Sequence, residues 1–302
     1  MRAPAGAAPP GTARTVGCRE LVDELTALLG GARHEARFIV EELLGPGAGG
    51  GGGPDDVRAP VAETARAMAA RRSAGEPLQY VLGHWAFRTL DLAVNPHVLI
   101  PRPETEQVVE VALAELRALG VGQPVVVDAG TGSGAIALAV AAEVPGAVVW
   151  GIDDSADALA VAAANLARVE RDPGLRGGVT FVVGSWLEPL PPALRGAVSL
   201  VVSNPPYVAA SEWQHLPDEV RAEPRPALVA PAGRDGTPGL ACVETVLEQA
   251  LAWLARPGVV VVELAPHQAE AGAAAASALG YDEVRVEPDL AGRPRAVVAR
   301  AR

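Results

Sequence analysis

The sequence predicts an α/β fold in which a mostly parallel sheet, covered by helices on both faces, follows a small helical domain. From residue 125 onward, short apolar runs of strand length alternate with stretches whose apolar residues recur at helical spacing. Continuous apolar strands separated by helices are typical of a parallel sheet that is buried on both sides. Ligands of such sheets bind beyond the carboxyl ends of the strands, so functional residues are expected in the loops there.

Composition and periodicity divide the chain into four parts. Residues 1–16 are rich in Ala, Pro and Gly and are predicted to form a disordered tail, whereas residues 17–80 are predicted to form the helical domain. Because this domain is too short to bury much core of its own, we expect it to recognise a partner. Residues 81–97 are predicted to be a linker, and residues 98–302 the main domain.

The elements are predicted in order along the chain. The helical domain has helical patterns at residues 17–44 and 57–73, separated by a glycine-rich loop at residues 45–54. In the main domain, apolar runs predict strands at residues 125–128, 148–152, 179–183, 197–202, 259–264, 284–286 and 296–299. The helices predicted between these strands lie at residues 135–144, 156–167, 240–254 and 268–279.

Composition argues against several classes of protein. The formal net charge is −11 and the sequence pI is near 5.0, whereas proteins that grip nucleic-acid phosphates usually have a basic face. The two cysteines, Cys18 and Cys242, have no partner at metal-ligand or disulfide-motif spacing, so neither a metal site nor a disulfide framework is expected. No apolar run reaches the roughly 18 residues of a membrane span, and the N-terminus lacks the apolar segment of a signal peptide. We therefore expect a cytoplasmic protein.

A glycine-rich loop follows the first strand of the main domain and opens a helix. Its residues are Asp128, Ala129, Gly130, Thr131, Gly132, Ser133 and Gly134. Glycines let the backbone approach a ligand closely, and a helix N-terminus offers free N–H groups to an anion. Asp153 ends the second strand about 20 residues further on, where a carboxylate can accept hydrogen bonds from ribose hydroxyls.

The loop alone leaves alternatives open. Gly130, Gly132 and Ala135 also fit the dinucleotide fingerprint, so both S-adenosylmethionine and NAD are compatible with the loop. A glycine-rich turn without a ligand is a third interpretation, and Asp153 could be an ordinary helix N-cap.

A second motif, the tetrapeptide Asn204-Pro205-Pro206-Tyr207, follows the fourth strand, whose carboxyl end is expected to lie beside the glycine loop. The side-chain oxygen of Asn204 and the main-chain carbonyl of Pro205 can each accept one N–H from a planar NH₂ group. Two acceptors fix that group and aim the lone pair of its poorly nucleophilic nitrogen at a methyl. The prolines stiffen the loop, and Tyr207 offers a flat face. Because a sulfonium is already a good leaving group, positioning and electrostatics can supply most of the catalysis.

In isolation the tetrapeptide is equally compatible with a proline-rich turn in which Asn204 is a turn residue. Its position after a fourth strand, downstream of the glycine loop and Asp153, favours methyl transfer instead. The NAD interpretation loses support with it, because nothing here resembles a hydride-transfer site.

With these motifs in place, the chain resembles the release factor glutamine methyltransferases, the PrmC/HemK family, from about residue 75 to the end. The segments Gly75–Gly83 and Val98–Glu106 are the most specific part of this resemblance. The glycine loop, the tetrapeptide, Glu223-Pro224 and the segment Asp289–Arg293 also look like the family. The tetrapeptide alone occurs in adenine-N6 methyltransferases too.

The resemblance implies a seven-stranded, Rossmann-like class I methyltransferase fold that uses S-adenosyl-L-methionine. It implies methylation of the side-chain amide nitrogen (N5) of the glutamine in the Gly-Gly-Gln motif of peptide-chain release factors, which the N-terminal domain helps to dock. The implied cofactor residues are Gly130, Thr131, Gly132, Ser133, Gly134, Asp153, Trp186 and Asn204. The implied substrate residues are Asn204, Pro205, Pro206 and Tyr207, and all of these except Pro206 are also expected to be catalytic.

The chain departs from the family pattern in places. Ser185 stands where an Asp often precedes the aromatic residue, which puts a contact to the adenine amino group in doubt, and Trp186 could instead be plain core. The Gly49–Gly53 insert is unusual for the family and lies in the region that is expected to dock the partner.

Three other functions fit some of the motifs. An adenine-N6 nucleic-acid methyltransferase uses the same tetrapeptide on a flipped base, but the acidic charge and the lack of an obvious target-recognition domain argue against it. A second is methylation of a glutamine in another protein. A third is a binding protein that has lost activity, against which the intact glycine loop, Asp153 and Asn204 argue.

Overall fold

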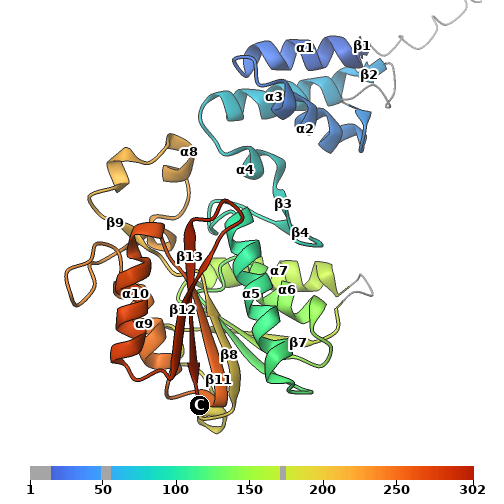
Figure 1. Cartoon of the computed structure of the whole chain (residues 1–302). Helices are drawn as coiled ribbons and strands as arrows, with labels where there is room; N and C mark the ends of the chain where they lie inside the picture. Colours follow the sequence, from blue (N-terminus) through green and yellow to red (C-terminus); the bar gives the residue numbers. More distant parts are fainter. Residues whose placement is uncertain (1–14, 49–55, 171–174) are drawn as a thin grey trace, which may run out of the picture. The chain divides into compact units, whose positions relative to one another are not determined.

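The computed structural model describes residues 15–48, 56–170 and 175–302, and the chain divides into two compact units, Met1–Leu82 and Gly83–Arg302 (Figure 1). Most of the predicted tail, residues 1–14, lies outside the described residues, as do residues 49–55 of the predicted glycine-rich loop.

The first unit is helical and buries a core of its own. Its elements are β1 (Thr15–Gly17), α1 (Cys18–Leu28), α2 (Arg33–Leu44), β2 (Asp56–Arg58), α3 (Ala59–Ser73) and α4 (Leu78–Leu82). Leu21, Leu25 and Ile39 are fully buried in its core, because they recur at helical spacing on the inner faces of α1 and α2. Thr15 pairs with Arg58 as β1 meets β2, so the chain is already in a strand where the sequence predicted the end of the tail.

The second unit is built on a seven-stranded sheet, as the sequence predicted. Its strands are β5 (Val125–Ala129), β6 (Val148–Asp153), β7 (Gly178–Val183), β8 (Val198–Ser203), β11 (Leu254–Glu263), β12 (Glu283–Pro288) and β13 (Pro294–Ala301). They lie in the order β12-β13-β11-β8-β5-β6-β7. The five strands from β11 to β7 are parallel, and β13 pairs antiparallel with both β11 and β12.

Helices cover both faces of this sheet (Figure 1). The helices are α5 (Pro103–Leu119), α6 (Ala135–Glu143), α7 (Ala156–Val169), α9 (Ala241–Ala250) and α10 (Ala269–Ala278). Alternate residues of a strand point to opposite faces, so Val126 packs with α5 and α6 whereas Val127 packs with α9. The sheet therefore has one apolar core on each face, which explains why its central strands are continuous apolar runs in the sequence.

Short elements complete the second unit. They are the hairpin β3 (His84–Phe87) and β4 (Leu90–Ala93), the parallel pair β9 (Val208–Ala209) and β10 (Val229–Ala230), α8 (Asp218–Arg221), and the 3-10 turns η2 (Pro192–Leu194), η3 (Trp213–His215), η4 (Arg225–Ala227) and η5 (Pro266–Gln268). The structure differs from the sequence-based elements in several places. The predicted linker contains the β3–β4 hairpin, α5 was not predicted, and α9 ends at Ala250, before the predicted end at residue 254. Leu254 pairs with Val198 and so belongs to the sheet.

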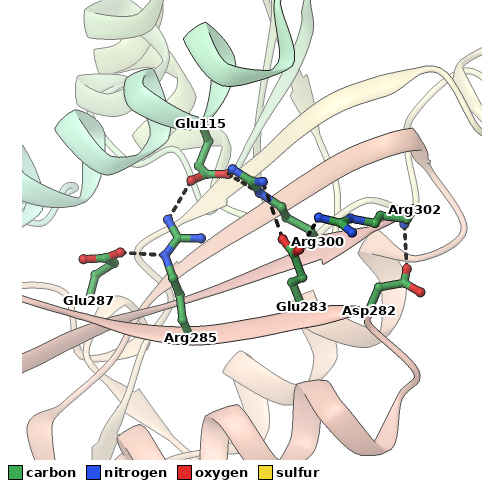
Figure 2. A network of polar contacts seen from close by, with 7 residues as sticks. All are labelled: Glu115, Asp282, Glu283, Arg285, Glu287, Arg300 and Arg302. Carbon is green, nitrogen blue, oxygen red and sulfur yellow. Dashed lines mark hydrogen bonds and ion pairs between the residues drawn. The ribbon is translucent and has the colours of Figure 1, made fainter.

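A buried carboxylate ties α5 to the edge of the sheet. Figure 2 shows Glu115 of α5 between Arg285 of β12 and Arg300 of β13. Arg285 Nη2 donates to Glu115 Oε1 at 2.6 Å, and Arg300 Nε donates to Oε2 at 2.7 Å. Burial opposes the charge, but the two guanidinium groups outweigh it and lower the pKa of Glu115. This clamp fixes the helix whose first turn reaches the site described below.

Candidate active site

The site forms where three parallel strands end at the same edge of the sheet. β5 pairs with β8 so that Asp128 lies opposite Val202, and β5 pairs with β6 so that Ala129 lies opposite Ile152. The glycine loop therefore lies between Asp153, which ends β6, and Asn204, which follows β8. This juxtaposition is the one predicted from strand counting.

Asp128 is hydrogen-bonded to the glycine loop and to the helix that follows it. Its Oδ2 accepts hydrogen bonds from Thr131 Oγ1 at 2.6 Å and from Ala137 N at 3.0 Å, so it joins the loop to the first turn of α6. Its Oδ1 is buried and has no partner among the described residues. Burial raises the pKa of this carboxyl to about 7, although the two hydrogen bonds oppose the shift.

Asp153 is also hydrogen-bonded to the glycine loop. Its Oδ2 accepts from Gly132 N at 2.8 Å, and its Oδ1 accepts from Ser155 N at 3.0 Å. Gly132 has φ of 54°, in the left-handed region that favours glycine. Burial raises the pKa of Asp153, against the two backbone hydrogen bonds. Each carboxylate oxygen still has a free lone pair, because a carboxylate offers about four acceptor positions.

A cavity of about 270 Å³ opens beside the loop. Six of the predicted site residues line it: Gly130, Gly132, Asp153, Trp186, Asn204 and Pro206. The other five, which do not line it, are Thr131, Ser133, Gly134, Pro205 and Tyr207. Thr131 and Ser133 are buried in the loop, and Gly134 is the residue before α6, with φ of 83°.

Trp186 has an unusual backbone for a bulky residue. Its φ is 49°, which is a genuine outlier for such a side chain. A Cβ added to Gly130 would lie 3.6 Å from Cζ3 of the indole, at ordinary van der Waals distance, so the ring lies directly against the glycine loop. The ring also packs against the core beneath it, so Trp186 is both a cavity residue and a partly buried core residue.

Asn204 is held by two residues that the sequence did not single out as site residues. Its Nδ2 donates to Thr105 Oγ1 at 3.0 Å, and Thr105 Oγ1 donates to Glu263 Oε2 at 2.8 Å. Tyr207 donates its hydroxyl to the other oxygen of Glu263 at 3.3 Å. Thr105 and Glu263 are both buried, and the Thr105–Glu263 pair comes from the first turn of α5 and the end of β11.

The Tyr207 hydroxyl is not suited to act as a general base. Burial, followed by the negative charge of Glu263, raises the pKa of the phenol, so the hydroxyl stays protonated at neutral pH. The backbone around it is fixed as well, since Tyr207 N donates to Leu228 O at 3.1 Å and Gln268 Nε2 donates to Tyr207 O at 2.9 Å.

Glu223 joins two walls of the cavity. Its Oε2 accepts from Ile100 N at 2.9 Å, and its Oε1 pairs with Arg102. Neighbours of these residues, Leu99 and Pro224, line the cavity. Burial raises the pKa of Glu223, whereas Arg102 and the Ile100 N–H lower it. This pair explains why Val98–Glu106 and Glu223-Pro224, quoted above only for their resemblance, both matter for the site.

The chemistry of the lining points to a cationic ligand. Two carboxylates, Asp153 and Asp154, line the cavity, and within the described residues no arginine does.

No group of three or more His, Cys, Asp or Glu side chains in residues 15–48, 56–170 and 175–302 could hold a metal ion. In these residues, no helix is both long enough and apolar enough to cross a membrane.

Comparisons with known proteins agree on one family. Residues 110–220 match the family model of the methyltransferase small domain. A release factor glutamine methyltransferase of Bordetella pertussis is 42% identical over 277 residues, covering 91% of this chain and 97% of that protein. Another, of Burkholderia pseudomallei, is 42% identical over 231 residues, covering 76% of this chain and 78% of that protein.

Solved structures show the same fold at low sequence identity. A methyltransferase from Pyrococcus furiosus superposes with a TM-score of 0.50 at 17% identity, covering 71% of this chain and 90% of that chain. A T. thermophilus 16S rRNA methyltransferase, solved in complex with AdoMet and guanosine, gives a TM-score of 0.52 at 17% identity, covering 72% and 50% of the two chains. The seven-stranded sheet is thus that of the class I methyltransferases, as predicted.

Proposed function

The chain belongs to the release factor glutamine methyltransferase family, and on this premise we propose that it methylates the side-chain amide nitrogen of a protein glutamine. The proposed methyl donor is S-adenosyl-L-methionine, and the proposed substrate is the glutamine of the Gly-Gly-Gln motif in a peptide-chain release factor. The two relatives described above are named for this activity, and their sequences align with most of this chain.

The orientation of Asn204 is the observation that carries the proposal. Its NH₂ group is used in the bond to Thr105, which leaves its Oδ1 to accept a hydrogen bond from a substrate at the cavity wall. An acceptor is what an incoming NH₂ group needs. The carbonyl of Pro205, the next residue, is the proposed second acceptor, so that both N–H bonds are held while the lone pair stays free.

The cavity fits the proposed methyl donor. Asp153 keeps acceptor capacity for ribose hydroxyls, Trp186 offers an aromatic face for an adenine, and Gly130 and Gly132 let the backbone come close. Its two carboxylates and lack of arginine among the described lining residues suit a sulfonium better than a pyrophosphate. When bound, S-adenosyl-L-methionine supplies an activated methyl group. The protein's own part is to orient the amide and exclude water.

Methylation of adenine in a nucleic acid is the weaker alternative. The tetrapeptide would accept the exocyclic NH₂ group of a flipped base in the same way. However, the relatives named above are glutamine methyltransferases, and the net charge of −11 disfavours a phosphate-rich partner.

We also propose that the first unit docks the release factor and that the enzyme acts in the cytoplasm. Within the described residues, every chemical motif lies in the second unit, which leaves Met1–Leu82 free for recognition. Cys242 is a free thiol, as is usual in a reducing compartment. A truncated chain that begins at Gly83 should bind the cofactor but methylate intact release factor poorly. Full activity on intact release factor would contradict the docking role.

The function is tested by mass spectrometry of a release factor after incubation with the full chain and S-adenosyl-L-methionine. One added methyl group on the glutamine of the Gly-Gly-Gln peptide is expected. A release factor whose motif glutamine is replaced by alanine is the control and should stay unmodified. Methylation of duplex DNA in place of the factor would favour the alternative, and methylation of a different protein glutamine would correct the substrate only.

A further inference from the structure

We propose that Thr105 and Glu263 are positioning residues that orient the carboxamide of Asn204, so that its oxygen rather than its NH₂ group faces the substrate. The inference rests on the proposed function, because it names the device that aligns the acceptor for the substrate amide. Asn204 lines the cavity, whereas Thr105 and Glu263 are buried behind it, so both act through Asn204.

The orientation follows from counting protons. An ionised carboxylate only accepts hydrogen bonds, so the Thr105 hydroxyl must donate its single proton to Glu263 Oε2, 2.8 Å away. The oxygen of Thr105 can then only accept from Asn204, 3.0 Å away, which requires Nδ2 of Asn204 on that side. In the part of the chain that the structure describes, no protein group donates to Oδ1 of Asn204, which is left for the substrate.

Protonation of Glu263 removes this constraint. A neutral carboxyl can donate to Thr105, and the Thr105 proton can then go to Asn204. The carboxamide of Asn204 would turn its oxygen to Thr105 and present its NH₂ group to the substrate. Two NH₂ groups cannot hydrogen-bond to each other through their protons, so the substrate amide would lose one of its two acceptors.

The charged and titratable groups around Glu263 come from three elements. Thr105 and, at longer range, Glu104 come from α5, Tyr207 follows β8, and Arg295 comes from β13. Glu263 is 1% exposed, and this burial raises its pKa to about 7, against the lowering effects of Thr105, Arg295 and Tyr207. The two orientations of Asn204 should therefore exchange near neutral pH.

The orientation can be observed without any substrate. The chain has only three asparagines, Asn95, Asn165 and Asn204, so labelling the full chain with ¹⁵N-asparagine gives three side-chain NH₂ signals. The Asn204→Ala variant identifies the signal of interest. We expect this signal to shift with a midpoint near the pKa of Glu263, about 7, and to stop titrating in Glu263→Gln. A signal that neither titrates in the wild type nor shifts in Thr105→Val overturns the proposal.

Turnover gives the second readout. Single-turnover methylation by the wild type should fall as the solution is made acidic, and Glu263→Gln should lack this pH dependence. Thr105→Val should lack it as well and should be slower by about tenfold. Thr105→Ser keeps the hydroxyl and should restore both the rate and the pH profile. Glu244→Gln, at a buried carboxylate of α9 that accepts from Arg234 N, is the matched control and should behave as the wild type.

The outcomes separate the two proposals. If Glu263→Gln and Thr105→Val bind the cofactor normally and keep the rate and pH profile of the wild type, the positioning role is wrong. If Glu263→Gln does not fold, Thr105→Val, which preserves the side-chain shape, decides the same question. If the wild type methylates no release factor, the proposed function fails, and the NH₂ titration of Asn204 still decides the positioning role.

Discussion

The proposed cofactor side and the proposed substrate side of the site are held together in different ways. On the cofactor side, Asp128 and Asp153 bind the loop between them, mostly through backbone N–H groups of nearby residues. On the substrate side, Asn204 depends on Thr105, 99 residues away in the chain, and Thr105 depends on Glu263, a further 158 residues away from it. A local motif builds the first side, whereas tertiary packing builds the second.

This difference predicts different responses to mutation. A carboxylate that binds backbone N–H groups fixes the path of the chain, so its loss changes the shape of the loop. A carboxamide held by a chain of side-chain hydroxyl and carboxyl groups can turn over while the backbone stays in place. Changes on the cofactor side should therefore appear as lost affinity, and changes on the substrate side as lost turnover.

Asp153→Ala should have the largest effect and should weaken cofactor binding. It removes the charge-assisted hydrogen bond that we propose Asp153 makes to ribose, worth about 1.5–3 kcal/mol, or roughly ten- to a hundredfold in affinity. It also leaves Gly132 N without its acceptor. Calorimetric titration with S-adenosyl-L-methionine measures the loss, and Glu270→Ala, at an exposed carboxylate of α10, should bind as the wild type. Unchanged affinity in Asp153→Ala would reject the ribose role.

Asn204→Ala should come next and should act on turnover. If the substrate amide binds as proposed, the variant lacks one acceptor and leaves a substrate N–H unpaired, which costs about 1–3 kcal/mol. If the contact strengthens as the nitrogen attacks, the loss appears in kcat more than in KM. Cofactor affinity, measured on the same protein, should change less than the single-turnover rate. A rate within about twofold of the wild type, well below the expected cost, would mean that the tetrapeptide does not hold the reacting nitrogen.

The same contrast explains how much of the fold could be predicted from the sequence. The apolar runs of β5 and β8 were recognisable because both faces of these central strands are buried, whereas β7, at the edge of the sheet, is partly exposed. The helix α5 was missed although its signals are local: Pro103 begins it, Val109, Leu113 and Leu116 recur on its buried face, and Gly120 ends it. The β3–β4 hairpin was missed because its strands are only four residues long.

The substrate side of the site could be predicted only in part. The tetrapeptide is contiguous, so its chemistry was visible, but the partners of Asn204 depend on the register of β11 against β8. Val262 pairs with Ser203, which brings Glu263 beside Asn204. The preceding residues of β11, Val259 to Val262, are identical, so a shift of one position leaves the apolar pattern unchanged. The sequence alone therefore gives no reason to place Glu263, rather than a neighbour, in the site.

Asp128→Asn should have a smaller effect, on stability and its pH dependence. Asp128 has a pKa of about 7 in the fold against an ordinary value of 3.8. Because the folded state holds the proton more tightly, this contribution to stability is complete below the ordinary pKa and is lost as pH rises through about 7. Between about pH 6 and about pH 8 the variant should lose roughly 1 kcal/mol less stability than the wild type.

Urea unfolding at the two pH values measures this difference. The variant keeps an oxygen for Thr131 and Ala137, so the loop should persist at both pH values. The comparison of the two sides predicts that Asp128→Asn flattens the pH dependence of stability but keeps the pH dependence of turnover assigned to Glu263. An unfolding free energy that changes with pH as in the wild type would show that Asp128 is ionised throughout.

Trp186→Leu should have the smallest effect, and it decides between two roles that the structure places in one side chain. As a cavity residue, Trp186 would stack on the cofactor, and its loss would weaken binding by about 0.5–1 kcal/mol, or two- to fivefold. As a core residue alone, it would lower stability on replacement and leave the affinity unchanged. Trp150 of β6 is the matched control, because it also packs against the α9 side of the core but does not line the cavity. We expect Trp150→Leu to change only the melting temperature and Trp186→Leu to change the affinity as well. Equal affinities in the two variants would assign Trp186 to the core and would leave the adenine face of the cofactor side to other residues.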